Sequence, residues 1–124
     1  MHADGAQPTF AVETDLLRPG VPRLQARGRL SQATVDELRV GVERWLRSSP
    51  WAIVVDLTGL SELRLAAVST LVDLARRAGR ADIGLYFVTS GGAVDHVLTS
   101  APSGDLFDIH HSVGSAERAL CMNT

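Results

Sequence analysis

The sequence predicts an α/β protein built on a mixed, mostly parallel sheet of four to five strands flanked by about four helices. The first observation is a continuous apolar run from Trp51 to Val55, closed by Asp56, which is typical of a strand buried on both faces. The second is that apolar side chains in residues 68–78 recur at spacings of three and four, as in an amphipathic helix. A short polar turn with Thr58, Gly59 and Ser61 is expected between them.

The other segments extend this unit in both directions. Alternating residues predict a hairpin that turns at Pro19-Gly20, and Gly79 is expected just beyond the end of the 68–78 helix. Before the central strand and helix, the predicted order is strands at 9–16 and 21–30 and then a helix that is capped by Ser31 or Thr34 and ended by Ser48-Ser49-Pro50. After them we expect a strand at 83–89, a short helix after Ser90-Gly91-Gly92 and a loop at 101–104. An edge strand at 106–109 and a helix around 113–120 complete the predicted order.

The composition excludes several classes of protein. Hydrophobic residues make up 45% and charged residues 21%, as in ordinary globular chains, and the net charge of −2 offers no footprint for nucleic acid. No apolar stretch approaches the roughly 20 residues that span a bilayer, and no signal peptide is evident, so we expect a cytoplasmic protein. Cys121 is the only cysteine, which excludes an intrachain disulfide. We expect a flexible tail at 1–8 and one domain at 9–124.

Four stretches share their order and spacing with a known family. They are Gly28-Arg29-Leu30 before the first helix, VVDLTGL at 54–60, the helix from Ala67 to Arg77, and LFDI at 106–109 with the helix after it. Together they resemble the STAS domain, the fold of bacterial anti-sigma factor antagonists. The resemblance implies a non-catalytic protein-interaction module that regulates transcription.

One stretch departs from the family pattern. After D-L-S-G-V the family usually continues T-x-x-D-S-S-G-L, and the partner kinase phosphorylates the first of these two serines. Here Arg64 stands at the aspartate position, Leu65 at the phosphorylated one, and Ala66 and Ala67 follow. Leucine has no oxygen to phosphorylate, so the usual phosphorylation switch does not carry over.

Several side chains near this stretch have two interpretations. Arg64 is either a clamp for phosphate or carboxylate or a solvated surface arginine. Leu60, Leu63 and Leu65 either form an exposed apolar patch or partly pack beneath the turn. Alternative phosphoacceptors are Ser61, Ser69 and Thr70, although Ser61 also suits a turn or N-cap and the other two a helix surface.

No catalytic or metal site is predicted. Ser90-Gly91-Gly92 fits a plain turn, with Ser90 as helix cap, better than a phosphate loop. His110 and His111 are adjacent and point to opposite faces of a strand, so they do not share a metal. Asp56 suits pairing with its own turn more than catalysis. Trp45 and Trp51 are expected as core or core-edge anchors.

The resemblance therefore predicts a partner-binding edge and no cofactor. The expected partner is an anti-sigma factor of the histidine-kinase-like ATPase type, and this chain is expected as a monomer or a homodimer. The alternative is a STAS-like accessory subunit of a transport ATPase, or a module that binds a small nucleotide or lipid. The predicted partner-binding residues are Leu30, Ser31, Thr58, Gly59, Leu60, Ser61, Arg64, Leu65, Ala66, Ser69, Ser90 and Gly91.

Overall fold

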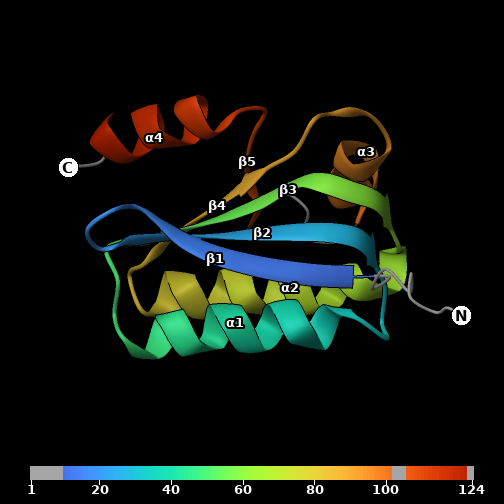
Figure 1. Cartoon of the computed structure of the whole chain (residues 1–124), viewed down its shortest axis with the longest axis horizontal. Coiled ribbons are helices and arrows are strands. Elements are labelled where there is room, and N and C mark those ends of the chain that lie inside the picture. Colours follow the sequence, from blue (N-terminus) through green and yellow to red (C-terminus); the bar gives the residue numbers. More distant parts are fainter. Residues whose placement is uncertain (1–9, 102–105, 123–124) are drawn as a thin grey trace, which may run out of the picture.

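The computed structural model describes residues 10–101 and 106–122, in which strands and helices alternate along the chain (Figure 1). The predicted tail at 1–8 and most of the predicted loop at 101–104 lie outside these residues. The elements are β1 (Phe10–Arg18), β2 (Val21–Leu30), α1 (Val35–Arg47), β3 (Ala52–Leu63), α2 (Leu65–Arg80), β4 (Gly84–Val88), α3 (Gly92–Ser100), β5 (Asp108–His110) and α4 (Val113–Met122).

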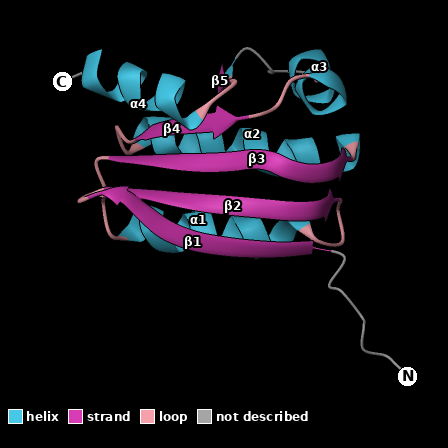
Figure 2. Ribbon diagram, turned by 45° about the horizontal axis from the view of Figure 1, so that its top comes forward, coloured by secondary structure: helices cyan, strands magenta, loops and turns pink. Residues whose placement is uncertain are grey.

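One five-stranded sheet of order β1-β2-β3-β4-β5 forms the centre of the described part of the chain (Figure 2). β1 and β2 are antiparallel and turn at Pro19-Gly20, as predicted. The pairs β2–β3, β3–β4 and β4–β5 are all parallel. The predicted fold class, a mixed and mostly parallel sheet with four helices, is confirmed.

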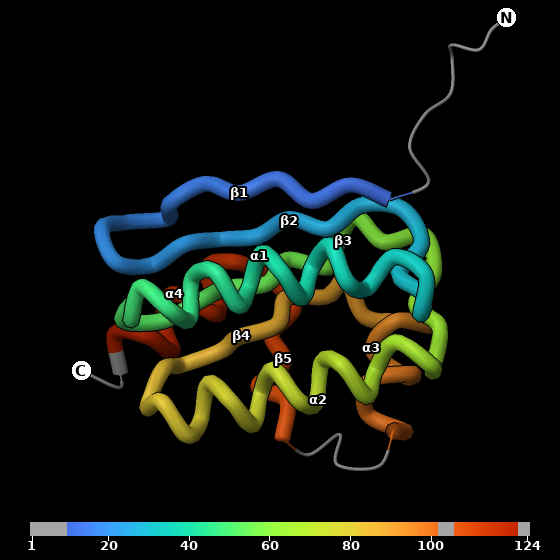
Figure 3. Tube along the Cα trace, turned by 90° about the horizontal axis from the view of Figure 1, so that it is seen from below, coloured from blue at the N-terminus to red at the C-terminus, as the bar shows by residue number. Residues whose placement is uncertain are grey.

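Helices cover the two faces of the sheet unequally. α1 and α2 lie side by side beneath one face, as seen from below in Figure 3, and the larger core lies between them and the strands. α4 packs on the other face over β3, β4 and β5 and buries a smaller cluster (Figure 1). The apolar run of β3 therefore serves both cores: Ile53 and Val55 belong to the larger one and Val54 to the smaller. This confirms a strand buried on both faces.

The predicted turn after Asp56 is wrong, because β3 continues to Leu63. Its second half pairs with the second half of β2, in a register that runs to Leu30↔Leu63 with two shifts on the way. A neighbouring strand thus satisfies the backbone of residues that, by sequence alone, favour a turn. Ser61 accordingly lies in a strand and caps no helix.

Four smaller predictions also need correction. α2 does not stop before Gly79 but includes it and ends at Arg80. Ser90 does not cap α3, because Gly91 occupies the N-cap position. Trp51 is 41% exposed, with the guanidinium of Arg18 5.1 Å above its ring, and it belongs to neither core cluster nor to the side chains packed against one, whereas Trp45 packs at the edge of the larger core as predicted. Thr34 is at the N-cap of α1, but its hydroxyl donates to the Arg29 carbonyl instead of capping the helix.

None of the helices in the described ranges is both long and apolar enough to cross a membrane.

Candidate protein-interaction surface

The predicted partner-binding residues gather at one end of the molecule. β2, β3 and β4 run parallel, so their carboxyl ends meet there, beside the first turns of α1, α2 and α3 (right-hand side of Figure 1). The backbone N–H of Arg64 donates to the carbonyl of Leu30 at 2.9 Å and ties the start of α2 to the end of β2. In open α/β sheets this edge is where ligands and partners bind.

The second half of β3 extends beyond its neighbour β4. The pairing of these two strands ends at Asp56↔Val88, whereas β3 continues for seven residues alongside β2 only. Thr58, Gly59 and Ser61 are exposed along this extension, and Leu60 is half-buried against the core. The extension therefore presents backbone and small polar side chains in a fixed, extended conformation.

Asp56 and Gly59 shape the beginning of this extension. The Asp56 carboxylate accepts hydrogen bonds from the Thr58 N–H at 3.0 Å and from its hydroxyl at 2.7 Å. This is the local pairing that the sequence favoured for Asp56. Next to it, a Cβ added at Gly59 would lie 2.9 Å from the Arg27 Cγ and 3.1 Å from the Ala26 carbonyl oxygen. Only glycine lets β2 and β3 come this close where their register shifts.

The first turn of α2 presents an apolar side chain to solvent. Arg64 is the N-cap in an extended conformation, and Leu65, the first helical residue, is 62% exposed. Ala66 and Ser69 are also exposed, whereas Ala67 and Val68 face the core. The helix thus turns one face inward and leaves Leu65, Ala66 and Ser69 on the outside.

Of the three leucines considered for an apolar patch, Leu65 alone is exposed. Leu63 is buried and Leu60 packs against the core, so the packing interpretation holds for these two. Leu30 is fully buried as well. Its side chain is therefore not accessible to a partner. Leu30 contributes to the surface only indirectly, because its carbonyl accepts the hydrogen bond from the Arg64 N–H.

A row of charges borders the exposed leucine. The Arg64 guanidinium donates to the Glu62 carboxylate at 2.9 Å, and Arg29 lies 3.9 Å from the other oxygen of that carboxylate. These side chains are largely exposed, so the pairs contribute little to stability. The solvated interpretation of Arg64 fits this geometry. The first turn of α2 contains no acidic residue, so the surface around its positive end stays basic.

The turn before α3 completes the surface. Gly91 is the N-cap with φ of +83°, a conformation that favours glycine, and Ser90 is exposed beside it. The buried Thr89 hydroxyl accepts from the Gly91 N–H and donates to the Asp95 carboxylate at 3.2 Å. Sequence reasoning missed the role of Thr89; a polar residue that closes a buried strand was the available signal.

Ser31 and the alternative phosphoacceptors occupy distinct settings. The Ser31 hydroxyl accepts from the Ala33 N–H at 3.2 Å within the turn from β2 to α1, so it has a local structural role. Ser61 lies exposed on β3, Ser69 is exposed on α2, and Thr70 is half-buried.

His110 and His111 have different partners. The Nδ1 of His110 lies 2.9 Å from the Ser115 hydroxyl, and this contact joins β5 to α4. The Nε2 of His110 lies 2.9 Å from Asp108 within β5. His111 is exposed and approaches Asp95 of α3 at 3.5 Å instead. Within the described ranges, no three histidine, cysteine or acidic side chains cluster as metal ligands.

The family profile that matches this chain describes the STAS domain and covers residues 17–116. The chain belongs to the STAS domain family. No curated protein matches it by sequence.

Solved structures share the fold of this STAS domain. An anti-sigma factor antagonist from Mycobacterium paratuberculosis has a TM-score of 0.80 and 18% identity, with 98% of this chain and 99% of that chain covered. The unphosphorylated form of the anti-sigma factor antagonist SpoIIAA has a TM-score of 0.71 and 13% identity, with 88% and 96% covered. The murine anion transporter Slc26a9 has a TM-score of 0.69 and 12% identity over 92% of this chain but only 22% of that chain. At these identities the likeness concerns the fold.

Proposed function

We propose that this STAS domain is a non-catalytic anti-sigma factor antagonist. It docks onto an anti-sigma factor of the histidine-kinase-like ATPase type, displaces the bound sigma factor and so activates transcription in a bacterial cytoplasm. Membership of the STAS family and the likeness in fold to two anti-sigma factor antagonists support the proposal.

The exposure of Leu65 is the observation that carries this proposal. Leu65 is 62% exposed at the first residue of a helix, and exposing that much apolar surface to water is unfavourable. Burial against a partner would remove this cost. Leu65 is surrounded by Arg64, Ala66 and Ser69, whose side chains are also exposed. An apolar centre with a polar rim is the usual composition of a protein-binding patch.

Recognition through Leu65 works by shape and apolar burial. The family's phosphoserine position carries no hydroxyl here, so no phosphate is added or removed at that point. Binding is then constitutive and set by the amounts of the two proteins. The β3 extension and the turn at Ser90-Gly91 contribute polar contacts around the leucine.

The test begins with affinity capture from the source cell, followed by measurement of the affinity for the captured ATPase. Leu65→Glu places a charge in the contact and is expected to weaken binding at least about tenfold, with folding intact. Leu106→Glu is the matched control, because Leu106 is 45% exposed and lies outside the surface. Its affinity should equal that of the unmodified protein.

Two results would contradict the proposal. The first is unchanged affinity of a folded Leu65→Glu variant, which would remove this leucine from the contact. The second is phosphorylation of Ser61, Ser69 or Thr70, detected by mass spectrometry of the captured protein, with binding that falls as the phosphorylated fraction rises. That result would restore a phosphorylation switch at another position.

The second candidate function is an accessory role in transport, alone or with a small nucleotide or lipid ligand. The likeness in fold to part of an anion transporter is the observation in its favour. Capture of a transport ATPase in place of a sigma regulator would select it.

A further inference from the structure

β1 forms an open edge of the sheet. It pairs with β2 on one side, and as the first strand in the sheet order it has no strand from residues 10–101 or 106–122 on its other side. Its outer backbone N–H and C=O groups are therefore available to another strand. At nine residues it is much longer than β5, the three-residue strand at the opposite edge. Figure 2 shows β1 along the outer border of the sheet.

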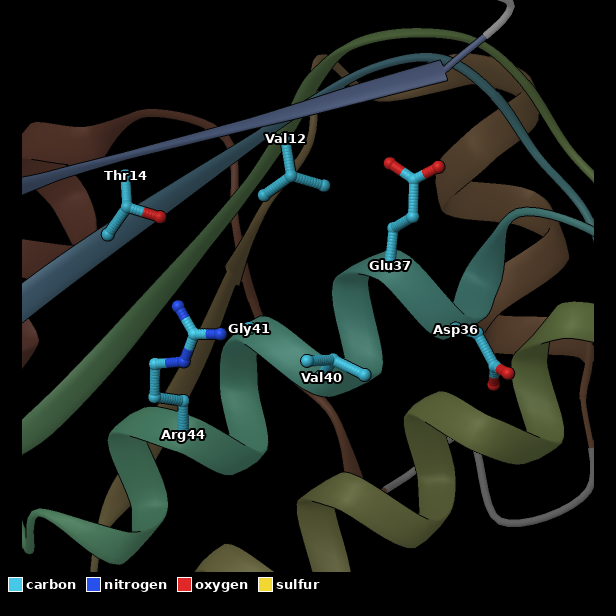
Figure 4. Close-up of a pocket in the computed structure, with 7 residues that line it drawn as sticks. All are labelled: Val12, Thr14, Asp36, Glu37, Val40, Gly41 and Arg44. Atoms are coloured by element: carbon cyan, nitrogen blue, oxygen red, sulfur yellow. The ribbon is translucent and has the colours of Figure 1, made fainter.

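A groove runs between this open strand and α1. It has a volume of about 490 Å³, and Figure 4 shows Val12 and Thr14 of β1 facing Glu37 and Arg44 of α1 across it. Val40 lies between these two along the helix and also lines the groove. Val40 is 43% exposed, and Leu16, on the same face of β1 as Val12 and Thr14, is 56% exposed. Among the described residues few large hydrophobic side chains are this exposed: of those at least 41% exposed, Val40 lines this groove and Leu16 continues the same face of β1 beyond Thr14.

The charged side chains along the groove face of α1 would pair with those of a second, antiparallel copy of the same helix. Glu37, Val40 and Arg44 follow one another along the helix at spacings of three and four and so share a face. Neither Glu37 nor Arg44 forms an ion pair within the described part of the chain. A two-fold axis at Val40 would place Glu37 of each copy beside Arg44 of the other.

The same axis suits the strands. α1 and β1 run in the same direction, with Arg44 beside Thr14 and Glu37 beside Val12 (Figure 4). An axis at Val40 therefore meets β1 at Glu13. Antiparallel pairing about Glu13 places Phe10 opposite Leu16, Val12 opposite Thr14 and Ala11 opposite Asp15 of the second copy.

We propose that this chain forms a two-fold symmetric homodimer through its β1 edge, which joins two sheets into one, with the two α1 helices side by side beneath the junction. A second copy of the chain fits the groove because strand, apolar residues and charges all match under a single axis, as an isologous interface requires. The one like-charge contact is Glu13 against its counterpart. Each Glu13 already pairs with Arg27 of its own sheet at 3.4 Å, which offsets the repulsion.

The dimer leaves the partner-binding surface free. That surface lies at the carboxyl ends of β2, β3 and β4, whereas the groove flanks the outer side of β1 and α1. Each dimer thus presents two partner-binding surfaces, and the two interactions are separable by mutation.

The first test measures mass in solution by light scattering and sedimentation across a concentration series. We expect about twice the chain mass of 13.3 kDa at high concentration. Leu16→Arg should weaken dimerisation at least tenfold and leave partner affinity unchanged. Leu65→Arg is the matched control with similar exposure, 62% against 56%, and should do the reverse. A monomer at every concentration, or a dimer indifferent to Leu16→Arg, would overturn the proposal without touching the proposed function.

Charge reversal tests the axis. Glu37→Arg and Arg44→Glu should each weaken the dimer, and the double variant should recover most of the loss, because the pair is restored between copies. If the double variant loses as much dimerisation free energy as the two single variants together, this pairing is refuted.

A disulfide tests the register. In a Cys121→Ser background, Glu13→Cys stands on the axis, where directly opposite Cα atoms are about 4.5–5.5 Å apart, within disulfide range. Mild oxidation should cross-link it into a covalent dimer. Asp15→Cys lies on the same face two residues along, about 14 Å from its own counterpart, and should stay monomeric. Equal cross-linking at both positions, or at neither, would reject the register.

Discussion

The two halves of β3 share one strand but differ in what surrounds them. Residues 52–57 are all buried, between α1 and α2 on one face and α4 on the other, with β2 and β4 on either side. Residues 58–62 have β2 alone beside them and are exposed or half-buried. The first half therefore fixes the fold. In the second half Leu60 packs against the core, but Thr58, Gly59 and Ser61 are exposed and so remain accessible to a partner.

One acidic substitution in each half would break or support this comparison most strongly. Val55 is 1% exposed in the larger core, so Val55→Asp buries an unpaired charge and should cost about 4 kcal/mol or more, enough to unfold the domain. Ser61→Asp, six residues along and exposed, should change stability by no more than about 0.5 kcal/mol. Chemical denaturation followed by circular dichroism measures both. A folded Val55→Asp protein of normal stability would show that the first half is no scaffold.

The sequence predicted the first half of β3 and not the second for a physical reason. A run such as Trp51–Val55 is apolar through its own residues, and so are the helical stripe of α2 and the alternation of β2. Residues 58–61, Thr-Gly-Leu-Ser, favour a turn locally, and they form a strand because β2, distant in sequence, pairs with them. Non-local pairing overrides local preference, and a single sequence does not reveal it.

The candidate site was predictable to a similar degree. The family resemblance predicted a partner-binding edge at the start of α2, and the parallel order of strands brings Ser90 and Gly91 to the same end. What the sequence left open was exposure. Leu60, Leu63 and Leu65 look equivalent in the chain, but Leu63 lies over the core because it pairs with Leu30, whereas Leu65 follows the N-cap and faces outward.

A pair of glycine substitutions sharpens the comparison at the point where the two halves of β3 meet. Gly59→Ala brings a Cβ within 3.1 Å of the Ala26 carbonyl oxygen, so β2 and β3 must separate and stability should fall by about 1 to 2 kcal/mol. Gly79→Ala meets nothing within 4 Å in the last turn of α2. It should stabilise the domain by about 0.5 to 1 kcal/mol through helix propensity. Thermal denaturation gives both signs, and two changes of the same sign would contradict the close approach at Gly59.

The smallest effect concerns the helix layer beneath the first half of β3. Glu43 of α1 accepts from Arg77 of α2 and from Arg39, and the hydrogen bond from Arg77, followed by that from Arg39, holds the pKa of the Glu43 carboxyl below its usual value. Because the pKa of Glu43 is lower in the folded state, the ion pair stabilises the domain fully at pH values above the pKa of glutamate in the unfolded chain, about 4.3. This stabilisation is lost as the pH falls through the folded value.

Glu43→Gln therefore should lower stability by about 0.5 to 1 kcal/mol at pH 7, a modest figure because the Arg77 side chain is 39% exposed. The difference between the two proteins should shrink below pH 4.3 and vanish once Glu43 is protonated. Asp15 and Asp36 also have lowered pKa values, through Arg23 and Arg39, so both proteins lose stability in acid and only their difference reports on Glu43. Denaturant unfolding at several pH values between 3 and 7 measures it. A constant difference across that range would mean that Glu43 acts by packing, and the ion pair between α1 and α2 would then have no part in supporting the buried half of β3.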